Sequence, residues 1–166
     1  MDKHQLPLNL AALLLEVAQV QGANRETLLQ CGHFDAQQRE RFQTCNTKSP
    51  MTAGTTLPAK QFYQLREAAL QITQQPNLDI FFAQGLAEQT LTGTLAHALA
   101  YSSSLERSLK ILCHHYQQIF SHITIEWQTA GKQTNLCFNA TKQGQSLQGQ
   151  LAREVFFIGV LTTMRS

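Results

Sequence analysis

Residues 92–120 read TGTLAHALAYSSSLERSLKILCHHYQQIF, and this stretch decides the fold of the chain. Its second half places apolar residues at intervals of four, three, four, three and one, which aligns them along one side of an α-helix. They are Leu105, Leu109, Leu112, Tyr116, Ile119 and Phe120. Before them, Ser103 and Glu106 have the spacing of a capping box, in which each side chain accepts a hydrogen bond from the other residue's backbone N–H. A shorter apolar helix precedes the serines, so we expect two helices joined by a tight polar turn.

The chain before this stretch predicts four further helices, bounded by turn and cap residues. The first ends near Gly22, Asn24 caps the second, Pro58 lies in the first turn of the third, and Asn77 caps the fourth. Gly85 inside the fourth marks either the close approach of another helix or a surface position. The inner faces consist of Leu10, Leu13, Leu14, Val17, Leu28, Leu29, Phe62, Leu65, Ala69, Ile72, Leu78, Phe81, Phe82 and Leu86.

Two parts of the chain leave this helical pattern. Residues 33–56 predict a surface loop with a short helix at 36–42. After residue 120 the apolar period becomes two, and residues 129–132 are turn-like, which predicts an antiparallel hairpin with one apolar face. That face consists of Ile123, Ile125, Trp127, Leu136, Phe138 and Ala140. A lone hairpin is marginally stable in water, so we expect other elements to cover it.

A last helix closes the chain and is apolar over more than half of its circumference, which predicts burial on two sides or an oligomer contact. Its apolar residues are Leu151, Val155, Phe156, Phe157 and Ile158, with Thr162 continuing the face. The fold class we predict is α+β: a mainly helical bundle packed against a small antiparallel β-hairpin sheet, in one domain over residues 1–166.

Length and composition narrow the class of protein. The chain has 166 residues, 43% of them hydrophobic, and a net charge of +2, and no run of Lys or Arg exceeds two residues. A nucleic-acid-binding surface usually concentrates basic residues, so we do not expect this segment to bind DNA directly. No stretch approaches the roughly 20 apolar residues of a membrane span, and the four cysteines lack close pairing, so we expect a cytoplasmic protein with reduced thiols.

The order of these segments resembles the N-terminal effector-binding and dimerisation domain of AraC-type bacterial transcription regulators, in its mainly helical, arabinose-binding-like form. Residues 91–116 carry most of the resemblance, supported by residues 21–23, 28–29 and 75–78. The resemblance implies a small-molecule effector, a possible homodimer, and DNA contact only through a C-terminal helix-turn-helix domain. Since this chain stops at Ser166, we expect it to be truncated, with the DNA-binding domain absent.

Six residues are candidates for contact with the effector, because aromatic and polar side chains commonly line sensor cavities. They are His97, Tyr101, Tyr116, Trp127, Phe138 and Phe156. His97 and Tyr101 are the stronger candidates, since they place polar tips on an otherwise apolar helix. The alternative is that all six are ordinary core residues.

Catalytic and metal chemistry have weaker signals. Cys113, His114 and His115, together with Cys31 and His33, contain metal-ligating types, but adjacent helix positions point apart, which favours a structural cysteine and surface histidines. The chain lacks a G-x-S-x-G motif and a phosphate-binding glycine loop. We therefore predict no enzyme activity, cofactor or metal. The main alternative is a stand-alone dimerisation module that associates through residues 151–164; a small thiol- or metal-dependent enzyme is more remote.

Overall fold

The computed structural model describes residues 4–45, 54–90, 92–121, 123–140 and 147–165. Within these residues the helices are α1 (Leu8–Val20), α2 (Arg25–Cys31), α3 (Ala36–Thr44), α4 (Ala59–Thr73), α5 (Leu78–Thr90), α6 (Gly93–Ala100), α7 (Leu105–Ile119) and α8 (Leu147–Arg165). The strands form two antiparallel pairs, β1 (Gln5–Pro7) with β2 (Thr56–Pro58), and β3 (Ile123–Ala130) with β4 (Gln133–Ala140). The predicted α+β class, mainly helical with a small antiparallel hairpin sheet, is confirmed. None of the described helices is long and apolar enough to cross a membrane.

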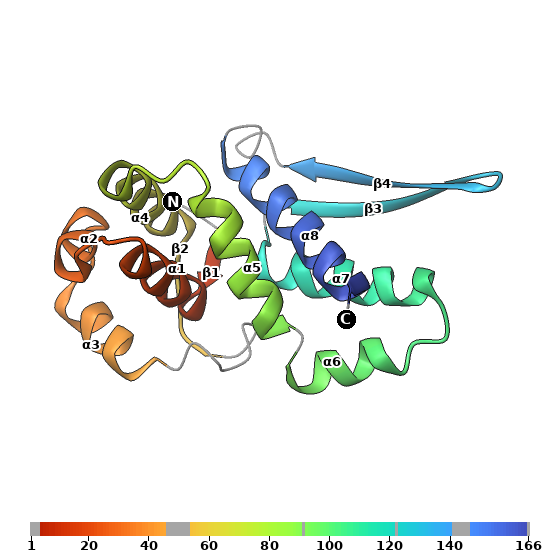
Figure 1. The fold of residues 1–166 in the computed structure, drawn as a ribbon, viewed down its shortest axis with the longest axis horizontal. Helices are drawn as coiled ribbons and strands as arrows, with labels where there is room; N and C mark the ends of the chain where they lie inside the picture. Colours follow the sequence, from red (N-terminus) through yellow and green to blue (C-terminus); the bar gives the residue numbers. More distant parts are fainter. Residues whose placement is uncertain (1–3, 46–53, 91, 122, 141–146, 166) are drawn as a thin grey trace.

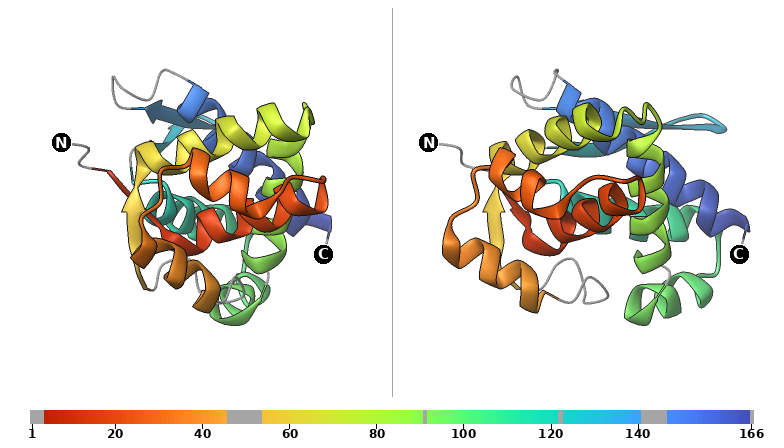
Figure 2. Two further views of the ribbon diagram at one scale, coloured as in Figure 1. Left: turned by 90° about the vertical axis from the view of Figure 1, so that its left-hand side faces the viewer. Right: turned by 60° about the vertical axis from the view of Figure 1, so that its left-hand side comes forward.

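Helix α5 runs through the middle of the molecule, with α1–α4 on one side and α6–α8 and the hairpin on the other (Figure 1). It packs against α1 and, along most of its length, against α8. In Figure 2 the end formed by α1–α4 faces the viewer, and α8 and the hairpin lie behind it. A Cβ atom added at Gly85 of α5 would lie 3.3 Å from Leu13 Cδ1 of α1, so this glycine marks a close helix approach.

The predicted boundaries of the N-terminal helices largely hold. Gly22 has a φ of +95° just after α1, as a left-handed helix end requires. The side chain of Asn24 accepts hydrogen bonds from the backbone N–H groups of Glu26 (2.9 Å) and Thr27 (3.2 Å), which confirms its role as the α2 cap. Pro58 instead ends β2, and α4 begins one residue later.

The capping box predicted for Ser103 and Glu106 is wrong by one residue. Ser104 is the N-cap of α7, and its hydroxyl accepts a hydrogen bond from the backbone N–H of Arg107 (3.2 Å). Glu106 instead forms an ion pair with Lys110 one turn later (2.6 Å). Any serine in a run of three can cap a helix, and the tertiary packing selects which one does.

Three residues assigned to inner faces are instead exposed, namely Ile72 (39%), Phe81 (36%) and Leu105 (57%). Ile72 and Leu105 lie at the ends of α4 and α7, and Phe81 lies in the first turn of α5. The rest of the α7 stripe is covered: Leu112, Tyr116, Ile119 and Phe120 are buried, and Leu109 is half-buried.

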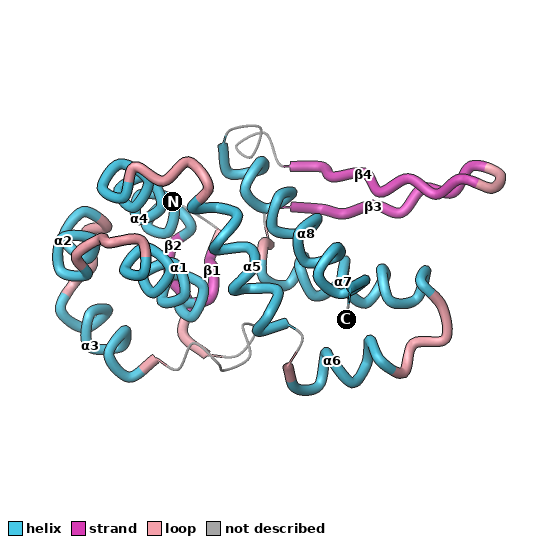
Figure 3. The backbone as a smooth tube through the Cα atoms, viewed as in Figure 1, coloured by secondary structure: helices cyan, strands magenta, loops and turns pink. Residues whose placement is uncertain are grey.

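The predicted antiparallel hairpin with one apolar face is confirmed. Ile125 pairs with Phe138 and Trp127 with Leu136, so these four side chains lie on one face of the ribbon. Gly131 has a φ of +63° at the first position of the two-residue turn, as a tight hairpin favours. Helices α7 and α8 cover the end of this face nearest Ile123, whereas the tip extends past the helices (Figure 3).

Helix α8 packs against α5 on one side and against α7 and the hairpin on another, which is the first of the two alternatives that its apolar circumference predicts. Leu151, Ala152, Val155 and Phe156 are buried, and Phe156 contacts Phe138 of the hairpin with ring centroids 5.1 Å apart. The same helix leaves Phe157 (53%) and Leu161 (55%) exposed.

A buried ion pair ties α4 to α5. Arg66 Nε donates to Asp79 Oδ1 (2.8 Å), and Arg66 Nη2 donates to the second carboxylate oxygen. The hydrogen bond to Asp79 raises the pKa of Arg66, and burial raises the pKa of the adjacent Tyr63. This two-bonded ion pair fixes the orientation of the two side chains relative to each other, and loss of either partner leaves an uncompensated charge in the interior.

Candidate functional site

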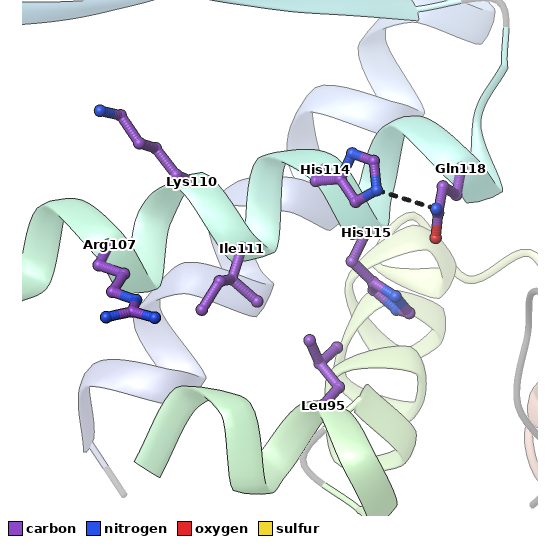
Figure 4. Close-up of a pocket in the computed structure, with 7 residues that line it drawn as sticks. All are labelled: Leu95, Arg107, Lys110, Ile111, His114, His115 and Gln118. Carbon is purple, nitrogen blue, oxygen red and sulfur yellow. Dashed lines mark hydrogen bonds between the residues drawn. The ribbon is translucent and has the colours of Figure 1, made fainter. Parts of the chain in front are cut away.

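A groove lies between α6 and α7. Its cavity volume is about 390 Å³, within the range of roughly 300–1,000 Å³ typical of small-molecule sites. The residues that line this α6–α7 groove are Leu95, Arg107, Lys110, Ile111, His114, His115 and Gln118. Figure 4 shows Arg107, Ile111 and His115 pointing from α7 toward α6, and Leu95 pointing back toward them.

The helical repeat brings the three α7 residues together. Arg107, Ile111 and His115 are four residues apart, and residues four apart lie on the same side of a helix. The cation stands at one end of the row, the apolar side chain in the middle and the histidine at the far end. The rise of 1.5 Å per residue separates Arg107 from His115 by about 12 Å along the helix axis.

His115 is the most unusual side chain in the groove. Its Nε2 atom is buried and has no hydrogen-bond partner among the described residues. Burial lowers the pKa of His115, and the neighbouring His114 lowers it further, so the imidazole is neutral near pH 7. A neutral ring nitrogen in this position can donate or accept one hydrogen bond according to its tautomer. Buried polar atoms are normally satisfied, so the unpartnered Nε2 atom of this groove-lining residue is a candidate to hydrogen-bond a ligand.

The remaining polar residues of the groove already have partners. Lys110 pairs with Glu106 (2.6 Å) and lies 5.4 Å from the centroid of the Trp127 ring. His114 and Gln118 share a hydrogen bond of 3.0 Å. Arg107 differs, since its guanidinium forms no ion pair with any residue in the described parts of the chain.

Helix α6, the other wall of the groove, is lightly anchored. Leu99 is its one buried residue, Leu95 and Ala96 are half-buried, and the other five residues are exposed. At its start Gly93 has a φ of +71°, a conformation that glycine adopts without steric cost. At its other end, Ser102 and Ser108 join their hydroxyl groups across the turn into α7. The groove therefore lies between α7, which packs against the core, and α6, whose displacement would expose little buried surface and so cost little free energy.

No protein-family model, curated protein or solved structure matches the chain.

A second hollow, of about 520 Å³, lies among α1, α2 and α3. Its charges are satisfied internally: Arg39 pairs with Glu26 (2.8 Å), and Arg25 donates to the side chain of Gln19 (3.1 Å) and to the carbonyl of Phe42 (3.3 Å). Because both of its arginines already have hydrogen-bond partners, this hollow has fewer free polar groups for a ligand than the α6–α7 groove has.

None of the six residues proposed from the sequence lines the α6–α7 groove. His97 and Tyr101 project from the α6 side and its following turn into solvent, and Tyr101 is 84% exposed. Trp127 lies on the hairpin beneath the Lys110 ammonium group. These positions do not place the three residues around one cavity.

The other three candidates meet in an aromatic cluster between α7, α8 and the hairpin. Tyr116 and Phe156 have ring centroids 5.5 Å apart, and Phe156 and Phe138 are 5.1 Å apart, both in edge-to-face contact. Tyr116 and Phe156 are almost fully buried, and Phe138 is half-buried. Their packing is that of a core, with edge-to-face pairs that stabilise the junction.

The candidate metal ligands are not assembled into a site. Within the described residues, no group of three or more His, Cys, Asp or Glu side chains could hold a metal ion. Cys113 is buried, and burial raises the pKa of its thiol, whereas His114 is exposed. Cys31 is exposed, and none of the four cysteines forms a disulfide.

Sequence reasoning missed Arg107, Ile111 and His115 as a group, although their spacing of four residues was visible. The apolar stripe of α7 drew attention to the opposite side of the helix, and Arg107 counted only as a residue off that stripe. A row of a cation, a β-branched residue and a histidine at helical spacing is the signal that would have found them.

Proposed function

We propose that this chain is the effector-sensing and dimerisation domain of an AraC-type transcription regulator, and that the α6–α7 groove receives the effector. The observation that carries this proposal is the groove itself, whose lining includes His115, a residue with an unpartnered buried Nε2 atom. The segment order that resembles this family supports the same assignment. DNA contact and a cytoplasmic location belong to the proposal, with a separate helix-turn-helix module reading the DNA.

The mechanism follows from the unequal anchoring of the two walls. An effector that contacts both Leu95 and Ile111 binds more tightly when α6 lies close to α7 than when it lies apart. Such differential affinity shifts the population toward the closed packing. Movement of α6 at Gly93 and at the serine turn then changes the surface that the domain presents to its DNA-binding module or to a second copy.

Ligand-dependent stabilisation tests the first half of the proposal. The chain is screened by thermal unfolding against a panel of metabolites, in parallel with an Ile111→Trp variant in which the larger indole fills the groove. A true effector at 100 times its dissociation constant stabilises the native state by about 2.7 kcal/mol. We expect compounds that stabilise the wild type and leave Ile111→Trp unchanged; a panel that stabilises neither, or both equally, contradicts the groove as the site.

A fusion tests the regulatory half. The chain is joined to a DNA-binding domain that represses a reporter gene only as a dimer, and repression is measured with and without the stabilising compound. Repression that changes with the compound supports a sensor. Absence of repression under both conditions contradicts a dimerising regulatory domain.

The second candidate is a stand-alone dimerisation module, and the exposed Phe157 and Leu161 of α8 favour it. These residues are one helical turn apart and more than half exposed, as an apolar contact surface requires. In the fusion assay this module gives constant repression that no compound alters, and a Leu161→Glu substitution abolishes it.

A further inference from the structure

The charges around the α6–α7 groove have one sign. Arg107 and Lys110 contribute positive charges, and no Asp or Glu is among the described residues that line it. Glu106, the nearest acidic residue in sequence, is engaged by Lys110. Because Arg107 has no ion-pair partner, its guanidinium can donate two parallel hydrogen bonds to a carboxylate.

The interior of the groove is apolar where the two helices face each other. Leu95 and Ile111 are both half-buried, and their side chains point toward one another across the gap. Burying apolar ligand surface here removes these two side chains from water, at roughly 25 cal/mol per Å² of area covered. The groove thus combines a cationic end, an apolar middle and a buried hydrogen-bonding atom of His115.

We propose that the groove binds an elongated organic acid, with its carboxylate at Arg107 and its apolar chain between Leu95 and Ile111. This inference rests on the proposed function, in which the same groove is the effector site, and it adds the chemical class of the effector. The far end of the molecule reaches toward His115, about 12 Å from Arg107 along α7. A hydroxyl group at that end satisfies the His115 Nε2 atom, so an ω-hydroxy acid binds more tightly than the simple acid.

Titration calorimetry with four eight-carbon probes tests this inference on the wild-type chain. The probes are octanoate, 8-hydroxyoctanoate, 1-octanol and octylammonium. We expect 8-hydroxyoctanoate to bind best, octanoate next, and the alcohol and the cation at least about tenfold more weakly than octanoate, the ratio expected for loss of one charged hydrogen-bonded contact. Equal binding of octanoate and octylammonium overturns the inference, since it shows an apolar site indifferent to charge.

Variants locate the contact. Arg107→Ala is expected to weaken octanoate binding about tenfold, whereas Arg41→Ala, which removes another exposed arginine, from α3, leaves it unchanged. Arg107→Glu reverses the charge and is expected to favour octylammonium over octanoate. Because Arg107 is exposed, both variants should retain the wild-type circular dichroism spectrum. Octanoate binding that is indifferent to Arg107→Ala and Arg107→Glu overturns the inference.

The outcomes separate this inference from the proposed function. If a neutral or cationic compound stabilises the wild type and not Ile111→Trp, the groove remains the effector site and the acid class is wrong. If octanoate binds through Arg107 but does not change repression in the reporter fusion, the acid-binding site is supported and the proposed regulatory function is wrong.

Discussion

The packing of α8 on α7 can be tested at Gly159. A Cβ atom added there would lie 2.1 Å from Tyr116 Oη and 2.8 Å from Tyr116 Cζ. Carbon atoms in contact are ordinarily about 3.5–4.0 Å apart. The Tyr116 side chain is 2% exposed and is held in edge-to-face contact with Phe156, so its ring cannot swing out of the way without disturbing the aromatic cluster.

Two opposing effects set the magnitude of a Gly159→Ala substitution. Replacing glycine by alanine inside a helix stabilises it by about 1 kcal/mol. Overpacking a close contact typically costs about 1–3 kcal/mol, and a contact this short belongs at the upper end. We expect a net loss of about 1–2 kcal/mol from the free energy of unfolding.

Gly85 provides the matched control. The same substitution there gains the same helix propensity, but the new Cβ lies 3.3 Å from a terminal methyl group of Leu13, which can shift by a few tenths of an ångström. We expect Gly85→Ala to change the free energy of unfolding by less than about 1 kcal/mol. Both variants are compared with wild type by urea denaturation followed by circular dichroism, with unchanged m-values. A Gly159→Ala protein as stable as Gly85→Ala would refute the close packing of α8 on Tyr116.

Three further predictions test other parts of the fold. Ser104→Ala should destabilise the protein by about 1 kcal/mol, the usual value of an N-cap, and Ser103→Ala by much less, measured by chemical denaturation; equal losses would contradict the observed cap. Asp79→Ala should cost about 3–5 kcal/mol because it leaves the Arg66 guanidinium buried without its partner, whereas Arg66→Met combined with Asp79→Leu should recover most of that loss; a double variant no more stable than Asp79→Ala would argue against a buried pair. Burial lowers the pKa of His115 below 6.5, so the unfolded state binds a proton at this residue more tightly than the folded state does. The free energy of unfolding should therefore be unaffected by His115 above pH 6.5 and should decrease as the pH falls toward the folded-state pKa. His115→Gln should remove this part of the pH dependence, and identical pH profiles of wild type and variant would count against the burial of His115.

The helices were predictable because each carries an apolar stripe with helical spacing and a recognisable end. Asn24, Gly22 and the alternation from Ile123 onward located α2, the end of α1 and the hairpin correctly. These signals are local, since they depend on the residues within one element.

The features that the sequence did not reveal depend on contacts between distant segments. Strands β1 and β2 are three residues long and pair Leu6 with Leu57, and so short a strand has no period to detect. The sequence motif favours Ser103, which alone of the three serines has Glu three residues later, yet the cap in the structure is Ser104. The capping box of Asp35 and Gln38 is the exception, since it is a local signal that the sequence does contain.

The candidate site was missed for a related reason. Aromatic residues were chosen as ligand contacts, and Tyr116, Phe138 and Phe156 pack into the core instead. The groove exists because α6 folds back beside α7 and leaves space between Leu95 and Ile111, an arrangement that depends on two helices together. Neither helix alone contains the information.

The most direct test of the account is an amide NMR titration of the chain with octanoate, which reports where a small molecule binds. We predict that the shifts concentrate on Leu95 and on the Arg107, Ile111 and His115 face of α7, and that they vanish in the Ile111→Trp variant. Shifts centred instead on Tyr116, Phe138 and Phe156 would contradict the assignment of the α6–α7 groove as the binding site.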